Sequence, residues 1–119
     1  MEDSNYTDEM LISAKQGDDG AQFLLAVRYY NRDETEQNYE HSVEWCLKAA
    51  EQGNIFAQSM LGICYYFGRG LTQSFEQAIA WFLKSAEQNH DGAQCHLGLC
   101  YYYGDGIKQD YRQSGSVVY

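Results

Sequence analysis

Residues recur along this chain at intervals of 36 positions, and this repetition constrains the fold more than any other feature of the sequence. The pair Ala-Gln occurs at positions 21–22, 57–58 and 93–94, and paired tyrosines occur at 29–30, 65–66 and 101–102. Tryptophan occupies positions 45 and 81, and Ala-Glu-Gln ends the matching segments at 50–52 and 86–88. So many matching positions predict a chain built from copies of one structural unit.

Each unit has the pattern of two helices. The small and apolar residues at 57, 61, 62 and 65 form one stripe at helical spacing, which predicts a first helix over about 57–67. Gly62 lies inside that stripe, where glycine destabilises a helix by about 1 kcal/mol, so we expect close approach of a neighbouring helix there. The second helices are expected to begin at good N-cap residues in register, Asn38, Ser74 and Asp110. Antiparallel helix pairs of this length stack into a right-handed α-solenoid.

The full motif resembles the Sel-one-like repeat (SLR), a relative of the tetratricopeptide repeat. It reads A-Q-x-x-L-G-x-x-Y-Y-x-G-x-G, followed by an aromatic residue, Trp, Lys and A-E-Q, and the unit at 57–92 matches it best. The resemblance implies an all-α, right-handed superhelix used as a scaffold for protein complexes, in a family with many bacterial members. One domain over 1–119 is expected, with an N-terminal half-repeat at 7–20, repeats at 21–56 and 57–92, a partial repeat at 93–113 and a tail at 114–119.

The charge and hydropathy of the chain exclude several classes of partner. The formal net charge is −9, so the chain lacks the basic surface that binding to a nucleic acid requires. No apolar run is long enough to span a membrane, and the acidic start is unlike a signal peptide, which favours a cytoplasmic protein. Residues 1–54 hold 12 Asp and Glu against 4 Lys and Arg. This acidic half either steers a basic partner or is simply a solvated surface.

The sequence predicts no enzyme, metal site or cofactor. Cys95, His96 and Cys100 would lie on one helix, where they diverge by about 100° or more and cannot converge on one ion. Cys64 and Cys100 occupy equivalent positions in successive units, about 8–10 Å apart, which is too far for a disulfide. The four cysteines are therefore expected to be reduced packing residues.

The resemblance to tetratricopeptide-like solenoids implies that the first helices line a concave face. Transferred residue by residue, this gives a partner-binding surface of three columns with two flanking aromatics. The residues are Phe23, Ser59 and Cys95; Val27, Ile63 and Leu99; Tyr30, Tyr66 and Tyr102; and Phe67 and Tyr103. The third column either lines an exposed groove or covers the edges of the core. Trp45 and Trp81 are expected in the core.

The leading hypothesis is a non-enzymatic interaction module that binds a peptide or a partner's helix in this aromatic groove. The first alternative is a small acidic inhibitor or immunity-type protein that masks a basic site on a toxin or enzyme. A remote alternative is a hydrolase. The second helix of the last unit ends near Gln113, so the preceding helix pair, with Phe75, Ile79 and Phe82, is expected to lack part of its cover. That C-terminal edge would pair with a second copy to form a homodimer, or the chain is a truncated piece of a longer array.

Overall fold

The computed structural model describes residues 2–103, which form six helices and no strand within that range. The helices are α1 (Glu2–Lys15), α2 (Asp19–Tyr30), α3 (Glu36–Glu51), α4 (Ile55–Phe67), α5 (Phe75–Ala86) and α6 (Asp91–Tyr103). The all-α prediction is therefore confirmed, and the first helix predicted over 57–67 begins two residues earlier, at Ile55.

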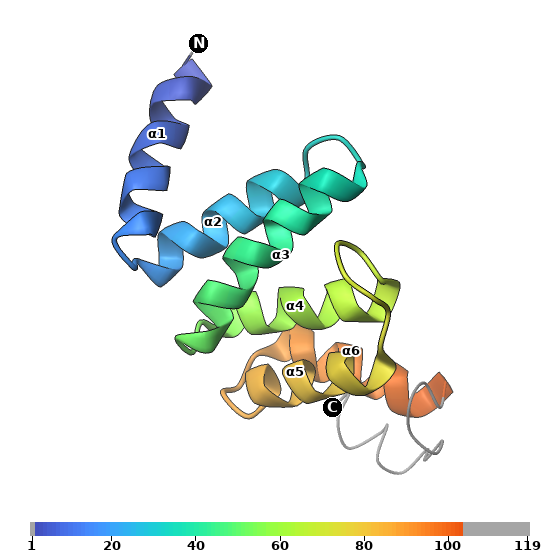
Figure 1. Ribbon diagram of the computed structural model, residues 1–119. Coiled ribbons are helices and arrows are strands. Elements are labelled where there is room, and N and C mark those ends of the chain that lie inside the picture. The colour runs from blue at the N-terminus through green and yellow to red at the C-terminus, as the bar shows by residue number, and fades with distance from the viewer. Residues whose placement is uncertain (1, 104–119) are drawn as a thin grey trace.

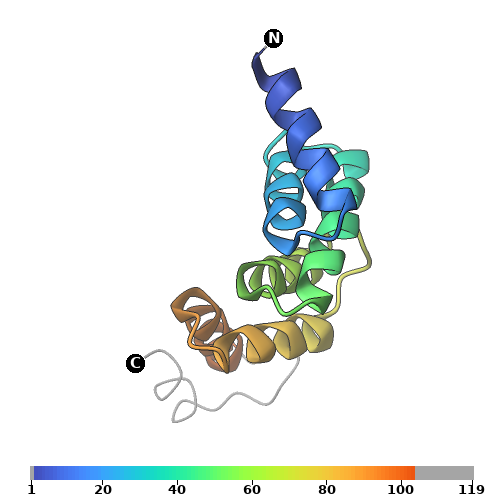
Figure 2. The same ribbon diagram turned by 90° about the vertical axis from the view of Figure 1, so that its left-hand side faces the viewer.

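The helices stack in the order of the sequence, and each packs mainly against its neighbours along the chain. Figure 1 shows the stack running from α1 to α6, and its extents of 50 × 27 × 21 Å make it an elongated body. In Figure 2 the first helices α2, α4 and α6 lie along one side, and the second helices α3 and α5 lie along the other. The molecule thus has a first-helix side and a second-helix side, as expected for a solenoid.

Side-chain caps fix where the second helices begin. Ser74 is the N-cap of α5, as predicted, and its Oγ accepts a hydrogen bond from the backbone N–H of Gln77. The prediction for α3 is wrong, because Thr35 rather than Asn38 is the N-cap and α3 begins one turn earlier. Thr35 Oγ1 accepts the N–H of Asn38, so Asn38 lies inside the first turn. The third expected cap, Asp110, lies outside the described residues.

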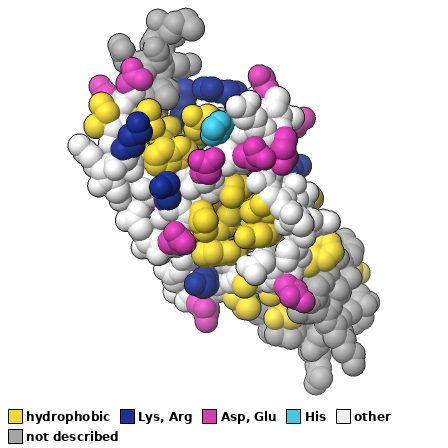
Figure 3. Space-filling model, viewed as in Figure 1, with side chains coloured by type: hydrophobic (Ala, Val, Ile, Leu, Met, Phe, Trp, Pro, Cys, Tyr) yellow, Lys and Arg dark blue, Asp and Glu magenta, His cyan; other side chains and the backbone are white. Residues whose placement is uncertain are grey.

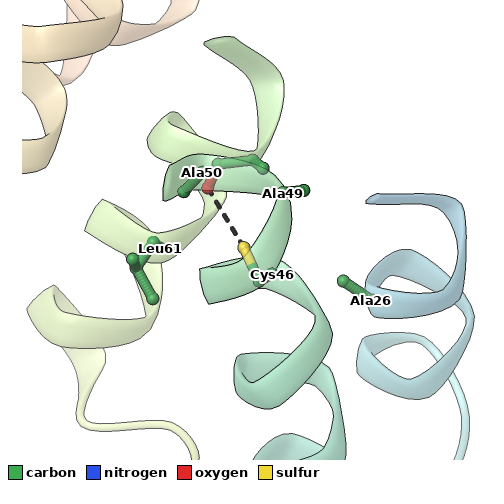
Figure 4. Packing of buried hydrophobic residues seen from close by; sticks show 6 residues of the cluster. Ala26, Cys46, Ala49, Ala50 and Leu61 are labelled. Carbon is green, nitrogen blue, oxygen red and sulfur yellow. Dashed lines mark hydrogen bonds between the residues drawn. The ribbon is translucent and has the colours of Figure 1, made fainter. Parts of the chain in front are cut away.

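The core between the first two repeats is made of small side chains. Ala26, Cys46, Ala49, Ala50, Ala57 and Leu61 form one buried cluster, drawn in Figure 4. Cys46 Sγ donates a hydrogen bond to the carbonyl oxygen of Ala57 over 3.0 Å. These short side chains let α2, α3 and α4 approach closely, and the Ala57 carbonyl gives the buried thiol a hydrogen-bond acceptor.

Gly62 lies where α4 meets α5, as the sequence predicted for a close helix contact. A Cβ atom at this position would meet two ring carbons of Phe82 at 2.6 Å. Phe82 is itself buried, with a second aromatic ring, that of His96, stacked 5.0 Å away. The absent side chain at Gly62 is therefore what makes room for the Phe82 ring.

Two expectations about the core need correction. Trp45 and Trp81 are half-buried rather than core, because each lies at the surface under a lysine. The Nζ atoms of Lys48 and Lys84 sit 5.8 and 5.0 Å from the centroids of the respective indole rings.

The second correction concerns the C-terminal edge. Phe75, Ile79 and Phe82 were expected to lack part of their cover. Ile79 and Phe82 are instead buried, in one cluster with Leu97 and Cys100 of α6, whereas Phe75 is half-buried. Helix α6, the first helix of the third repeat, covers Ile79 and Phe82 because it packs across α5. The expected partial second helix at 110–113 and the tail at 114–119 lie outside the described residues.

Glutamine side chains repeat one hydrogen-bond pattern at each junction between units. The Nε2 atoms of Gln22 and Gln58 donate to the carbonyls of Ala14 and Ala50 over 3.0 and 3.2 Å. Their Oε1 atoms accept from Gln52 and Gln88 over 2.8 and 2.9 Å. Gln94 donates likewise to Ala86 over 3.4 Å. This glutamine ladder satisfies polar groups that the stacking of the repeats would otherwise bury unpaired.

Candidate functional site

A hollow of ≈ 330 Å³ opens between α4 and α6, on the first-helix side of the stack. Phe82 of α5 forms its floor, because this ring packs beneath both helices. Apolar and aromatic side chains make up most of the lining, which consists of Ile63, Tyr66, Phe67, Phe82, His96, Leu99 and Cys100. Four of these, Ile63, Tyr66, Phe67 and Leu99, belong to the surface predicted from the sequence.

Large apolar side chains surround the hollow and remain open to solvent. Phe67 and Leu99 line it and are 55 and 51 % exposed, and Tyr102, three residues after Leu99 on α6, is 47 % exposed. Tyr66 is half-buried, and its ring contacts Phe67 and Phe75 at centroid distances of 5.0 and 5.2 Å. Exposing an apolar group of this size to water costs free energy, so such a group marks a surface that can bury its apolar area against a partner.

His96 forms one wall of the hollow. Its ring lies parallel to that of Phe82, with an angle of 10° between the planes and 5.0 Å between the centroids. Nδ1 lies 2.6 Å from the carbonyl oxygen of Gly92, one turn earlier in α6. The sequence analysis treated His96 only as a rejected metal ligand and missed its place in this wall. Its helical spacing from Leu99, three residues apart, was the available signal.

Tyr30 belongs to a different cluster, centred on Arg69 of the next repeat. Arg69 Nη1 donates a hydrogen bond to the hydroxyl of Tyr30, and this bond raises the pKa of the guanidinium above its ordinary value. The guanidinium carbon also lies 5.6, 5.7 and 4.7 Å from the ring centroids of Tyr30, Tyr39 and Phe67. Arg69 therefore ties the turn of the second repeat to the first repeat, a contact that the sequence analysis did not foresee.

An aromatic row lies at the other end of the first helices. Phe56 is 52 % exposed, and its ring lies 5.9 Å from that of Phe23 and 5.2 Å from that of His90. Phe23 was part of the predicted surface, whereas Phe56 was not, because glycines occupy the equivalent positions in the neighbouring units.

The remaining predicted residues do not gather at one site. Ser59 is buried, so it offers little surface to a partner, and Val27 is half-buried beside Arg28. Cys95 is exposed on α6. The side chain of Tyr103 lies outside the described residues.

Acidic side chains are spread over the face of the molecule seen in Figures 1 and 3, on which α3 and α5 lie in front. Figure 3 shows them around an apolar area in the middle of this face, with a few basic side chains among them. The acidity is therefore distributed over this side of the molecule rather than gathered in one patch.

The cysteines and acidic residues form no reactive or metal-binding cluster in the described part of the chain. None of the four cysteines, all of which lie in the described part of the chain, forms a disulfide. Burial raises the pKa of the Cys64 thiol to about 12 and that of Cys46 further still, so both stay protonated at neutral pH. Among residues 2–103, no helix combines the length and the apolar character needed to cross a membrane.

The Sel1 repeat profile matches residues 20–54, 55–90 and 92–114, three consecutive copies that account for most of the chain. The chain belongs to the Sel1 repeat family. Sel1 repeat proteins generally mediate protein–protein interactions, and their fold is a non-catalytic repeat scaffold. The matched boundaries lie within two residues of the repeats predicted at 21–56 and 57–92.

Two solved structures support the same assignment for this Sel1 repeat protein. One is a protective antigen present in uropathogenic Escherichia coli strains that displays an SLR fold, with 34 % identity and a TM-score of 0.87. The other is a Sel1 repeat protein from Oxalobacter formigenes, with 32 % identity and a TM-score of 0.86. Each match covers 92 % of this chain, but 24 % of the first structure and 84 % of the second. No curated protein matches the chain.

Proposed function

We propose that this Sel1 repeat protein binds a peptide or a partner's helix in the hollow between α4 and α6. One observation carries the proposal: two large side chains that line this hollow, Phe67 and Leu99, are about half exposed. In the free protein these side chains contact water, and a partner's apolar side chain would remove that area from solvent at roughly 25 cal/mol per Å².

The shape of the site fits such a ligand. A volume of ≈ 330 Å³ is at the lower end of the range of about 300–1,000 Å³ found for ligand pockets, so it suits one large side chain rather than a whole folded segment. Hot spots of protein interfaces have this form, a large aromatic or aliphatic anchor in a pocket surrounded by weaker contacts.

Selection of displayed random peptides on the immobilised protein tests the proposal. Affinities of the selected peptides are then measured for the wild type and for Phe67→Ala, Leu99→Ala and Leu83→Ala. Leu83 is the matched control, because it is 41 % exposed but lies on α5 and does not line the hollow. We expect the first two variants to lose about tenfold or more in affinity, and Leu83→Ala to bind as the wild type does. Peptides that bind all four proteins equally would place the binding surface elsewhere.

The alternative of an acidic inhibitor gives a different result in the same assay. The excess of acidic residues in 1–54 would then dominate, and the affinity would fall steeply as salt rises. Binding in the hollow should depend little on salt, since its lining contains no Asp, Glu, Lys or Arg.

A further inference from the structure

The imidazole of His96 offers the hollow a polar atom of defined character. Nδ1 lies 2.6 Å from the carbonyl oxygen of Gly92. A carbonyl oxygen only accepts hydrogen bonds, so the neutral ring carries its proton on Nδ1. Nε2 then holds a lone pair and can only accept.

The position of the ring leaves Nε2 for a ligand. One face of His96 is covered by Phe82, in a stacked contact at 5.0 Å. Nδ1 is hydrogen-bonded to a carbonyl of its own helix. Nε2 takes part in none of the hydrogen bonds found among residues 8–102. The side chain is half-buried and lines the hollow, so its free ring edge meets whatever enters.

The charge of the surroundings restricts which donor can enter. The lining contains no Asp, Glu, Lys or Arg, so a charged ligand group would lose its hydration without an opposite charge in the lining. Within the described residues the nearest guanidinium, that of Arg69 beside the Phe67 ring, already donates to Tyr30. The net charge of −9 further disfavours an acidic ligand. The complementary group is a neutral N–H donor on an apolar body.

We propose that the hollow accepts a tryptophan side chain of the partner, with the indole N–H donating to Nε2 of His96. The proposal deepens the function proposed above and rests on it. Indole fits because its nitrogen donates and has no lone pair left to satisfy, whereas a phenol oxygen would need a donor as well. The flat ring would pack on the exposed faces of Phe67 and Leu99, as indole anchors do in protein interfaces.

The test compares two ligands that differ in one atom. They are N-acetyltryptophanamide and its benzothienylalanine analogue, in which sulfur replaces the indole N–H. Each is titrated into the labelled protein at about pH 8, where a free imidazole is neutral, and shifts of backbone amide NMR signals give the affinities. The proteins are the wild type, His96→Phe, His96→Gln and the control His41→Phe. His41 also contacts an aromatic ring, that of Tyr29 at 5.0 Å, although the two rings are tilted by 36°, and it lies on α3, away from the hollow.

We expect the wild type and His41→Phe to bind the tryptophan ligand roughly three- to tenfold more tightly than its analogue. His96→Phe retains a ring against Phe82 and should bind the two ligands equally. His96→Gln places an amide oxygen near the former Nε2 and should restore part of the preference. Thermal unfolding by circular dichroism verifies that the variants fold.

Three outcomes overturn the inference and leave the binding function intact. The first is equal binding of both ligands by the wild type through signals of α4 and α6, and the second is a preference that persists in His96→Phe. Absence of binding by either ligand at millimolar concentration, while selected peptides still depend on Phe67, would also reject tryptophan as the anchor. If neither ligand binds and the peptides ignore Phe67, the proposed function fails with it.

Discussion

The contact between Gly62 and Phe82 gives a quantitative prediction for the substitution Gly62→Ala. In an isolated helix this change stabilises by about 1 kcal/mol, because alanine loses less backbone entropy. Here the new methyl group would meet two carbons of the Phe82 ring at 2.6 Å and a third at 3.0 Å. The ring cannot retreat easily, since it is 1 % exposed and stacked on His96.

The two effects have opposite signs, and the steric one should be larger. Forcing an extra methyl group into a packed core typically costs about 1–3 kcal/mol, and separations this short call for the upper half of that range. After subtracting the gain of about 1 kcal/mol, we expect Gly62→Ala to lower the free energy of unfolding by about 1–2 kcal/mol. For a chain of 119 residues this lowers Tm by roughly 4–8 °C.

Thermal unfolding followed by far-ultraviolet circular dichroism measures this change. The control introduces Gly62→Ala into a Phe82→Leu background, where the ring is gone and the alanine should instead stabilise. If Gly62→Ala alone is as stable as the wild type, the ring is not held in place and the reasoning about close approach is wrong.

Four further experiments test other contacts. Gln58→Leu should lower the free energy of unfolding by about 1–3 kcal/mol, measured by urea unfolding, because the Ala50 carbonyl and the Gln88 amide each lose a hydrogen-bond partner. The exposed Gln73→Leu should change it little. Arg69→Met should lower it by about 0.5–1 kcal/mol through loss of the contacts with aromatic rings, and Tm that stays unchanged would contradict this. A thiol reagent should label Cys95 rapidly and Cys64 only on unfolding. Burial raises the pKa of Cys64 from 9.0 to about 12, so the contribution of its neutral thiol to the free energy of unfolding is complete below pH 9 and should be lost as pH rises toward 12. If Tm relative to that of Cys64→Ala stays constant over this range, the raised pKa is wrong.

The 36-residue period predicts the fold well because stacking makes equivalent positions share one environment. Ala57, Leu61 and Gly62 are buried as their columns require. Caps are decided more locally. Asn38 occupies the column of the expected cap, but Thr35 caps α3. The first repeat lacks the glycine turn that ends α4, so its second helix starts earlier.

The candidate site was less predictable, because it depends on residues that break the repeat. Tyr30 and Tyr102 share a column, yet Tyr30 is engaged by Arg69, which has no counterpart in the turn of the first repeat. Phe56 stands where the other repeats have glycine, so a column-by-column argument passes over it. Side chains that occur in only one repeat distinguish one part of the surface from another, and periodicity says nothing about them.

The glutamine ladder makes the seams between repeats interchangeable. The donor at Gln22 and the carbonyl of Ala14 stand in the same relation as Gln58 and the carbonyl of Ala50. A duplicate of residues 55–90 inserted after position 90 would therefore present the same donors and acceptors at both new seams. A residue inserted or removed inside a helix would instead rotate the helix face beyond it by about 100° and separate such pairs. Changes in the length of the helical part of this scaffold are thus quantised, because whole repeats keep the hydrogen bonds between units and a partial repeat does not.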